Sequence, residues 1–191
     1  VALSLVDQGV LGLDDSIGLR RPDLPVAWHG ATLRQLLNHT SGVPDFILSE
    51  AAQDAIRASV AVPLPPRALL DFVKDLPLRK QGKYHYSNSD NIIVGLIVEA
   101  VTGVPYDEAL ANEVSTPLGL TQTRLPVGPE RPVPFIHGYD IEDGGRYDDV
   151  SELLAAGWAW ASGGVISTPA DLNRFIRGYV GNELFGAAVA A

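Results

Sequence analysis

The feature that most limits the possible folds of this chain is one apolar segment near its centre. Residues 92–98 form its longest unbroken apolar run, and Gly103 follows shortly afterwards. This pattern predicts a helix from about Ser89, whose hydroxyl can cap it, to Val101, with Gly103 ending it. The side chains expected to pack inward are those of Ile92, Ile93, Leu96, Ile97 and Ala100. The apolar run is far shorter than the roughly 20 residues of a membrane span, so no membrane crossing is expected in this chain.

Most of the other regular structure is also expected to be helical. Thr32 and Gln35 form a capping box, which predicts a short helix ending at about Asn38. Apolar spacing, prolines and capping residues predict further helical segments at Ala2–Gly9, Ser49–Val60, Arg67–Leu76, Pro105–Val114 and Thr168–Tyr179. Residues 121–150 are rich in proline, glycine and acidic groups, so we expect an irregular stretch with a brief strand at Phe135–Ile141.

Composition narrows the classes of partner. With 191 residues, 46% of them hydrophobic, the chain is long enough to bury a core. Its formal net charge is −9 and it has only 14 lysines and arginines, so we expect no nucleic-acid partner, because such binding relies on basic residues that displace counterions. The chain has no cysteine, so it can hold neither a disulfide nor a thiolate site.

The sequence predicts neither a metal site nor an organic cofactor. The histidines show no metal-ligand spacing. Acidic residues gather near position 145, but their spacing fits no calcium-binding EF-hand loop, so a solvated acidic loop is the favoured interpretation. These residues are Asp140, Glu142, Asp143, Asp148 and Asp149.

The most informative segment is the polar stretch Tyr-His-Tyr-Ser-Asn-Ser-Asp-Asn at residues 84–91, immediately before the central helix. A turn at the end of a rigid helix can hold side chains firmly at a cleft. Together with that helix, the segment resembles the Tyr-x-Asn motif of class C β-lactamases, D-alanyl-D-alanine carboxypeptidases and related esterases. Further segments agree with this family in the same order along the chain, at Leu5–Gly9 with Leu13–Asp15, Leu36–Gly42, Thr116–Leu120 and Ala161–Phe175.

The resemblance implies a fold as well as a chemistry. It predicts a mainly α structure, the helical subdomain of the α/β serine β-lactamase and DD-peptidase-like fold, with residues 1–191 as part of a single domain. The parent's antiparallel sheet would then come from segments before Val1 and after Ala191. A Lys-Thr-Gly or His-x-Gly strand, which the family has after the last helix, is also expected beyond this segment.

The nucleophile implied by the resemblance is the serine of a Ser-x-x-Lys motif at the start of a long helix, and Leu3–Gly9 matches the end of that helix. None of the eleven serines in this chain has a lysine three positions later. We therefore expect the nucleophile upstream of Val1, and we expect these 191 residues alone to be inactive.

Residue roles follow from the same resemblance. Tyr86 corresponds to the base that takes the proton of the serine, which is a poor nucleophile until that proton is removed. A tyrosine ordinarily ionises only near pH 10, so this role requires nearby cations, chiefly the lysine of the Ser-x-x-Lys motif. Asn88 corresponds to an amide that binds the substrate and that lysine, and Trp158 corresponds to a residue that lines the substrate cleft. The alternative is a purely structural role: Tyr86 and Asn88 would be polar residues of the turn and the helix cap, and Trp158 would pack in the core.

Two neighbouring features have competing interpretations. Ser89-Asp90-Asn91 matches the Ser-Asp-Asn element of class A β-lactamases. This segment comes too late along the helix for that role, so we expect these residues to cap the helix and form its first turn instead. His39 lies in a His-Thr-Ser-Gly sequence, which resembles a turn of the family, and we expect its imidazole to hold the chain after a helix.

The function expected of the intact parent is acyl transfer through an acyl-serine, on a peptide ending in D-Ala-D-Ala or on a β-lactam. One alternative is a short-chain carboxylesterase, because esterases share these motifs. Another is a non-catalytic relative that binds peptidoglycan fragments. By resemblance, the parent is expected to be secreted or periplasmic.

Overall fold

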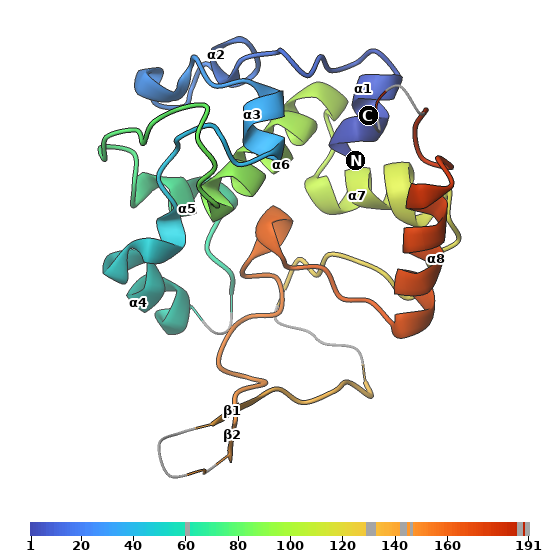
Figure 1. The fold of residues 1–191 in the computed structure, drawn as a ribbon. Coiled ribbons are helices and arrows are strands. Elements are labelled where there is room, and N and C mark those ends of the chain that lie inside the picture. The colour runs from blue at the N-terminus through green and yellow to red at the C-terminus, as the bar shows by residue number, and fades with distance from the viewer. Residues whose placement is uncertain (60–61, 129–132, 142–144, 146, 187–188, 190–191) are drawn as a thin grey trace.

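A computed structural model describes residues 1–59, 62–128, 133–141, 145, 147–186 and 189 (Figure 1). The α-helices are α1 (Ala2–Asp7), α2 (Ile17–Arg20), α3 (Leu33–Leu37), α4 (Glu50–Ala58), α5 (Pro66–Asp71), α6 (Asn88–Thr102), α7 (Tyr106–Leu110) and α8 (Pro169–Val180). Single turns of other helix types lie at Val26–Trp28 (η1), Phe46–Leu48 (η2), Ala111–Ser115 (η3) and Trp160–Ser162 (η4). The described strands, β1 (Tyr139–Ile141) and β2 (Tyr147–Asp149), pair antiparallel.

Helix α6 is the centre of the structure, as its apolar sequence predicts. Its left-handed end at Gly103, where φ is 72°, confirms the predicted stop. Four of the five residues expected to face inward are buried, but Ala100 is exposed. Val94 and Val98 are buried in addition, because α6 is covered on several sides by other elements and not on one face alone.

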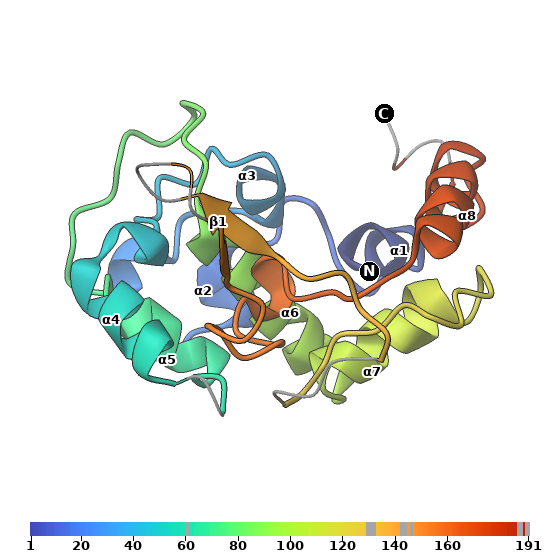
Figure 2. The ribbon, with the colours of Figure 1, turned by 90° about the horizontal axis from the view of Figure 1, so that it is seen from below.

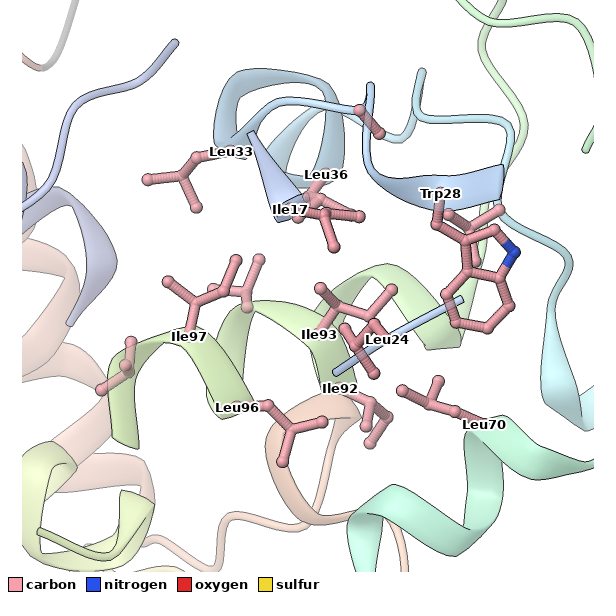
Figure 3. Close-up of a cluster of buried hydrophobic side chains, with 14 of the residues drawn as sticks. Ile17, Leu24, Trp28, Leu33, Leu36, Leu70, Ile92, Ile93, Leu96 and Ile97 are labelled. Carbon is pink, nitrogen blue, oxygen red and sulfur yellow. The ribbon is translucent and has the colours of Figure 1, made fainter. Parts of the chain in front are cut away.

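The main core forms where short helices cover α6. Figure 3 shows Ile93 and Ile97 facing Ile17 of α2 and Leu33 and Leu36 of α3, with the indole ring of Trp28 at the side of the cluster away from Ile97. This core contains large side chains that have almost no solvent exposure, namely Ile17, Trp28, Leu33, Leu36, Leu69, Leu70, Ile92, Ile93 and Ile97. At about 25 cal/mol for each square ångström of apolar surface removed from water, such burial is the dominant stabilising contribution.

The flanking helices agree with the predictions in kind but differ in length. Thr32 and Gln35 form both hydrogen bonds of the predicted capping box at the start of α3. Helix α4 ends at Ala58, and Val60 of the predicted segment lies outside the described residues. Helix α5 ends at Asp71 instead of Leu76, because the following amides bond carbonyls only three residues back and the chain continues as tight turns.

A second, smaller part of the molecule lies beside α1 and α7. There Val114, Leu118 and Leu120 form a separate buried cluster, against which Val1 and Phe175 pack. Figures 1 and 2 show α8 at the edge of the molecule, beside α1. The β1–β2 hairpin projects at the bottom of the structure in Figure 1. It lies within the stretch expected to be irregular, and β1 is shorter than the predicted strand. Across the described part of the chain, no helix is long and apolar enough to span a bilayer.

Candidate active site

The start of α6 is tied to the turn that follows α3. The helix begins at Asn88 with Ser87 as its N-cap residue, so the prediction that Ser89 caps it is wrong. Ser89 is fully buried; its hydroxyl donates to the carbonyl of Pro44 at 2.7 Å and accepts from the amide of Phe46 at 3.0 Å. Ser89 therefore fastens the first turn of α6 to residues 44–46.

Asp90 makes a second link between α6 and the turn after α3. Its carboxyl group has no solvent exposure, and it accepts a hydrogen bond from the Ser41 hydroxyl at 2.5 Å. Its other oxygen lies 3.2 Å from Nδ1 of His39. The backbone amide of Ser87 also points at this nitrogen, at 3.5 Å. Together these contacts join the 39–41 turn to the first turn of α6.

Burial controls the ionisation of both members of this pair. The pKa of Asp90 is raised to about 8, chiefly by burial; the Ser41 hydrogen bond acts in the opposite direction, and the negative charge of Asp45 makes a smaller contribution to the rise. Burial also lowers the pKa of His39, although the charge of Asp45 opposes that shift. Both shifts favour the uncharged forms near neutral pH, in which Nδ1 of His39 can accept a hydrogen bond from the Asp90 carboxyl group or from the Ser87 amide.

Tyr86 lies on the outer side of this pair. Its ring packs on the His39 ring, with the ring centroids 4.5 Å apart, and half of the Tyr86 side chain is exposed. The His39 backbone has a left-handed conformation, with φ at 57°, and its carbonyl accepts from the amide of His85 at 2.9 Å. His39 thus fixes the chain after α3, as expected, and it also supports the tyrosine.

Asn88 completes the group. Its Oδ1 lies 3.4 Å from the Tyr86 hydroxyl, which donates to it. Its Nδ2 lies 3.1 and 3.3 Å from the two carboxylate oxygens of Asp45, which is almost fully buried. Asp45 in turn caps the turn η2 by accepting from the amide of Ile47 at 3.2 Å. The structure thus brings Tyr86 and Asn88 together on one surface, with two acidic residues behind them.

Trp158 lies elsewhere, at the wall of a cavity of about 790 Å³. Apolar groups of Phe135, Leu154 and Ile166 share this wall, and Arg124 lies at the same cavity. Trp158 is half-buried and also packs against the main core, so it has both a cleft face and a core face. Among the described residues, no hydrogen bond joins Trp158 to Tyr86 or Asn88, and the Tyr86 ring packs on His39 and not on Trp158.

Trp160 has a packing role. Its ring lies 5.1 Å from that of Tyr106 and covers Gly95 of α6 so closely that a Cβ atom there would lie 2.6 Å from it.

The acidic loop does not form a metal site among the residues that the structure describes, in which no group of three potential ligands gathers. Asp149 binds Nδ1 of His137 at 2.8 Å on the surface, and hydrogen bonds, those from Ser151 above all, lower its pKa to about 2. Glu142 and Asp143 lie outside the described residues.

Comparison with known proteins places the chain in a family. A model of the family described as Beta-lactamase matches residues 1–190. The chain belongs to the β-lactamase family. Its relatives there are penicillin-binding proteins and D-amino-acid amidases, so the resemblance seen in the sequence is confirmed at the level of the family.

Particular β-lactamase-family members match almost all of the chain. Penicillin-binding protein 4 of Amycolatopsis lactamdurans is 31% identical, over all of this chain and 52% of that protein. A D-stereospecific amidohydrolase from Streptomyces sp. superposes with a TM-score of 0.87 and is 27% identical, over 98% of this chain and 58% of that one. D-amino acid amidase from Ochrobactrum anthropi SV3, in complex with L-phenylalanine, has a TM-score of 0.82 and 28% identity over 98% of this chain and 53% of that one.

Nearly all of the chain therefore matches part of the β-lactamase and penicillin-binding protein fold, and it spans about half the length of these relatives.

Two residues of the candidate site were not predicted from the sequence as partners of the site residues, namely Asp45 and Asp90. A signal for Asp90 was present, because it lies three and seven positions before Ile93 and Ile97, on the face of α6 that is buried. Asp45 had no such signal, since its partner Asn88 is 43 residues away in the sequence.

Proposed function

We propose that the full-length protein containing this chain is a serine hydrolase that acts through an acyl-serine intermediate. The nucleophile is the serine of a Ser-x-x-Lys segment outside these 191 residues, and residues 1–191 are part of a single β-lactamase-like domain whose sheet is completed by other segments. Membership of the β-lactamase family and the absence of a Ser-x-x-Lys pair from this sequence support the proposal.

The observation that carries the proposal is the position of the Tyr86 hydroxyl. Tyr86 is half-exposed, its hydroxyl lies beside the amide of Asn88, and its ring packs on His39, which is tied to the buried Asp90. Such a tyrosine has a fixed position but an open side, as required of a base that takes the serine proton and returns it to the leaving group. In this proposal Asn88 binds the substrate and the lysine of the Ser-x-x-Lys segment.

The substrate class follows from the chemistry that the relatives share. Their names describe penicillin binding and hydrolysis of D-amino acid amides. We therefore assign to the full-length protein a peptide or amide with a D-amino acid at the acyl position, most simply a D-Ala-D-Ala peptide, or the β-lactam that mimics it. Peptidoglycan peptides lie outside the cytoplasm, so this proposal also places the protein in a secreted or periplasmic compartment.

Trp158 is assigned to the wall of the substrate cleft. Its half-buried indole and the apolar residues beside it form a surface suited to an apolar side chain. Short-chain esters are the second substrate class, because the Tyr-x-Asn motif does not distinguish an ester carbonyl from an amide carbonyl.

Mass spectrometry after incubation with a penicillin tests the proposal directly. The full-length protein is expected to gain one β-lactam on the serine of a Ser-x-x-Lys motif, whereas a chain of residues 1–191 is expected to gain none. An adduct on a serine within residues 1–191 would show that the nucleophile is misplaced. If the full-length protein is not labelled, a D-Ala-D-Ala peptide and a short-chain ester are tested next. Turnover of the ester alone indicates an esterase, and binding of peptidoglycan fragments without turnover indicates a non-catalytic relative.

A further inference from the structure

We propose that Asp45 is a positioning residue, which holds the carboxamide of Asn88 so that the amide oxygen faces Tyr86. This inference deepens the proposed function and rests on it for its catalytic consequence. Its structural basis is independent, because it concerns which of two similar atoms Asn88 presents to the site.

The contacts of Asp45 identify Asn88 as its partner. Both carboxylate oxygens lie within 3.1–3.3 Å of Nδ2 of Asn88, and Asp45 is only 7% exposed. Asp45 lies in the segment 39–48, and Asn88 is the first residue of α6. The pair therefore bridges this segment and α6, which also meet through the hydrogen bonds of Ser89 and Asp90. The pair is therefore held in a fixed frame.

Simple hydrogen-bond chemistry then decides the orientation of the amide. A carboxylate can only accept hydrogen bonds, whereas a carboxamide has one accepting side and one donating side. If the amide were reversed, its oxygen would face the two Asp45 oxygens, and this nearly buried carboxylate would keep only the Ile47 amide as a donor and would also meet a second acceptor, which is costly. The Nδ2 side of Asn88 must therefore face Asp45, and Oδ1 must face the Tyr86 hydroxyl, 3.4 Å away.

This orientation matters for the proton that Tyr86 is proposed to carry. Oδ1 accepts from the protonated hydroxyl and can equally accept from an ammonium group placed beside it. A reversed amide would present N–H groups to the tyrosine oxygen, and these would compete for the lone pair that must receive the serine proton. Asp45 thus acts on the proposed base only through Asn88.

A merely structural role for Asp45 can be separated from this one by the choice of substitution. Asp45 also caps η2 through the amide of Ile47. Serine and asparagine are both good capping residues, so Asp45→Ser and Asp45→Asn preserve the cap. Asp45→Ser removes the group that reaches Asn88, whereas Asp45→Asn leaves a group that can pair with either side of the Asn88 amide. Asp75, an exposed residue, supplies the matched control Asp75→Asn, which removes one negative charge from the surface.

The first measurement is β-lactam acylation of the full-length protein. Asp45→Ser and Asp45→Asn are expected to lower the rate constant of acylation at saturating substrate by about 10- to 100-fold, the scale of a small misplacement in an active site. The concentration giving half-maximal rate should change much less, and Asp75→Asn should behave like the parent. If Asp45→Ser melts at the parent's temperature and acylates at the parent's rate, Asp45 does not position Asn88 for catalysis.

The second measurement does not depend on activity. In the ¹⁵N-labelled full-length protein, the side-chain amide signal of Asn88 is identified by its loss in Asn88→Ser. Its two protons should exchange slowly with solvent in the parent and in Asp75→Asn, and at least 10-fold faster in Asp45→Ser. Equal exchange in parent and Asp45→Ser would overturn the assignment of Asp45. If no substrate is turned over by the parent, the proposed function fails, while this measurement still decides the role of Asp45.

Discussion

The carboxyl group of Asp90 and the imidazole of His39 meet at 3.2 Å beneath the ring of Tyr86. Neither group is positioned by the local sequence alone, because 51 residues separate them. Burial makes both of them weakly ionised near neutral pH, so the tyrosine proposed to take a proton does not have a carboxylate directly behind its supporting ring. This relationship leads to the first prediction.

Replacing Asp90 with Asn should change how the stability of the protein depends on pH. The pKa of Asp90 is raised in the folded state to about 8 from its ordinary value of 3.8, so the folded state binds more protons than the unfolded state between these values. The contribution of Asp90 to the free energy of unfolding therefore has its full value below about pH 4. This contribution is lost as the pH rises to about 8. Asp90→Asn, which is always neutral, removes this loss.

The lowered pKa of His39 acts in the opposite direction at and below its ordinary value of 6.5, where protonation favours unfolding. The clearest window for Asp90 is therefore pH 6.5–8. Melting temperatures there should fall with pH more steeply for the parent than for Asp90→Asn. Parallel curves would show that Asp90 is ionised in the folded protein throughout this window. Asp75→Asn serves as the control for loss of a surface charge.

Replacing Tyr86 with Phe tests the proposed base in the full-length protein. The ring contact with His39 is retained, so the melting temperature should change little. The acylation rate should fall by about 10²- to 10⁴-fold, the usual contribution of a positioned acid-base group. Tyr84→Phe removes a phenol two residues away that is 64% exposed, and it should acylate like the parent. Acylation of Tyr86→Phe at the parent's rate would rule out this mechanism.

Replacing Ser89 with Ala tests the alternative Ser-Asp-Asn assignment. The structure gives Ser89 two buried hydrogen bonds, to Pro44 and Phe46, and no contact with Tyr86. Its loss should cost about 2 kcal/mol of stability, because the Phe46 amide is left without a partner. Ser49→Ala, which removes the cap of α4, should cost about 1 kcal/mol.

Denaturant unfolding of the full-length protein compares the two serine variants. The folded Ser89→Ala variant should acylate at a rate close to the parent's. A large loss of acylation rate without a loss of stability would instead favour a catalytic Ser89.

Replacing Gly95 with Ala tests the packing of η4 on α6. A Cβ atom at Gly95 would lie 2.6 Å from the Trp160 ring and 2.8 Å from Cβ of Ala161. Helical propensity favours alanine, but overpacking should dominate and destabilise the protein by about 1–3 kcal/mol. Gly30→Ala meets no atom within 4 Å and should be neutral or slightly stabilising. A gain in melting temperature for Gly95→Ala would mean that Trp160 does not pack there.

The outer face of α8 should bind a hydrophobic dye in a chain of residues 1–191. Leu172, Ile176 and Val180 recur at helical spacing on α8, and each is more than half exposed. A contiguous apolar face of this kind favours dye binding and association. Ile176→Lys should reduce dye fluorescence without lowering the melting temperature. Phe175→Lys, one residue earlier, should unfold the second cluster, against which Phe175 packs. Dye binding that is unaffected by Ile176→Lys would place the exposed apolar surface elsewhere.

The sequence alone determined the elements whose signals are local. The apolar run before Gly103 specifies α6, and the capping box at Thr32 and Gln35 specifies the start of α3. Both depend on residues within a few positions of each other. The family was also readable, because its motifs are short and keep their order along the chain. Errors appeared where local rules compete with packing: Ser89 is a good capping residue but is drawn into the interior by Pro44 and Phe46.

Only the tertiary structure decided what surrounds the proposed base. Asp45 reaches Asn88 across 43 residues, and Asp90 reaches Ser41 across 49. No local pattern encodes such pairs, because they form only when the turn after α3 is packed against the first turn of α6. Burial at that contact then sets the ionisation of Asp90, and the Asp45 carboxylate sets the orientation of the Asn88 amide. These are properties of the environment of a residue and not of its type, so they emerge only once the chain is folded.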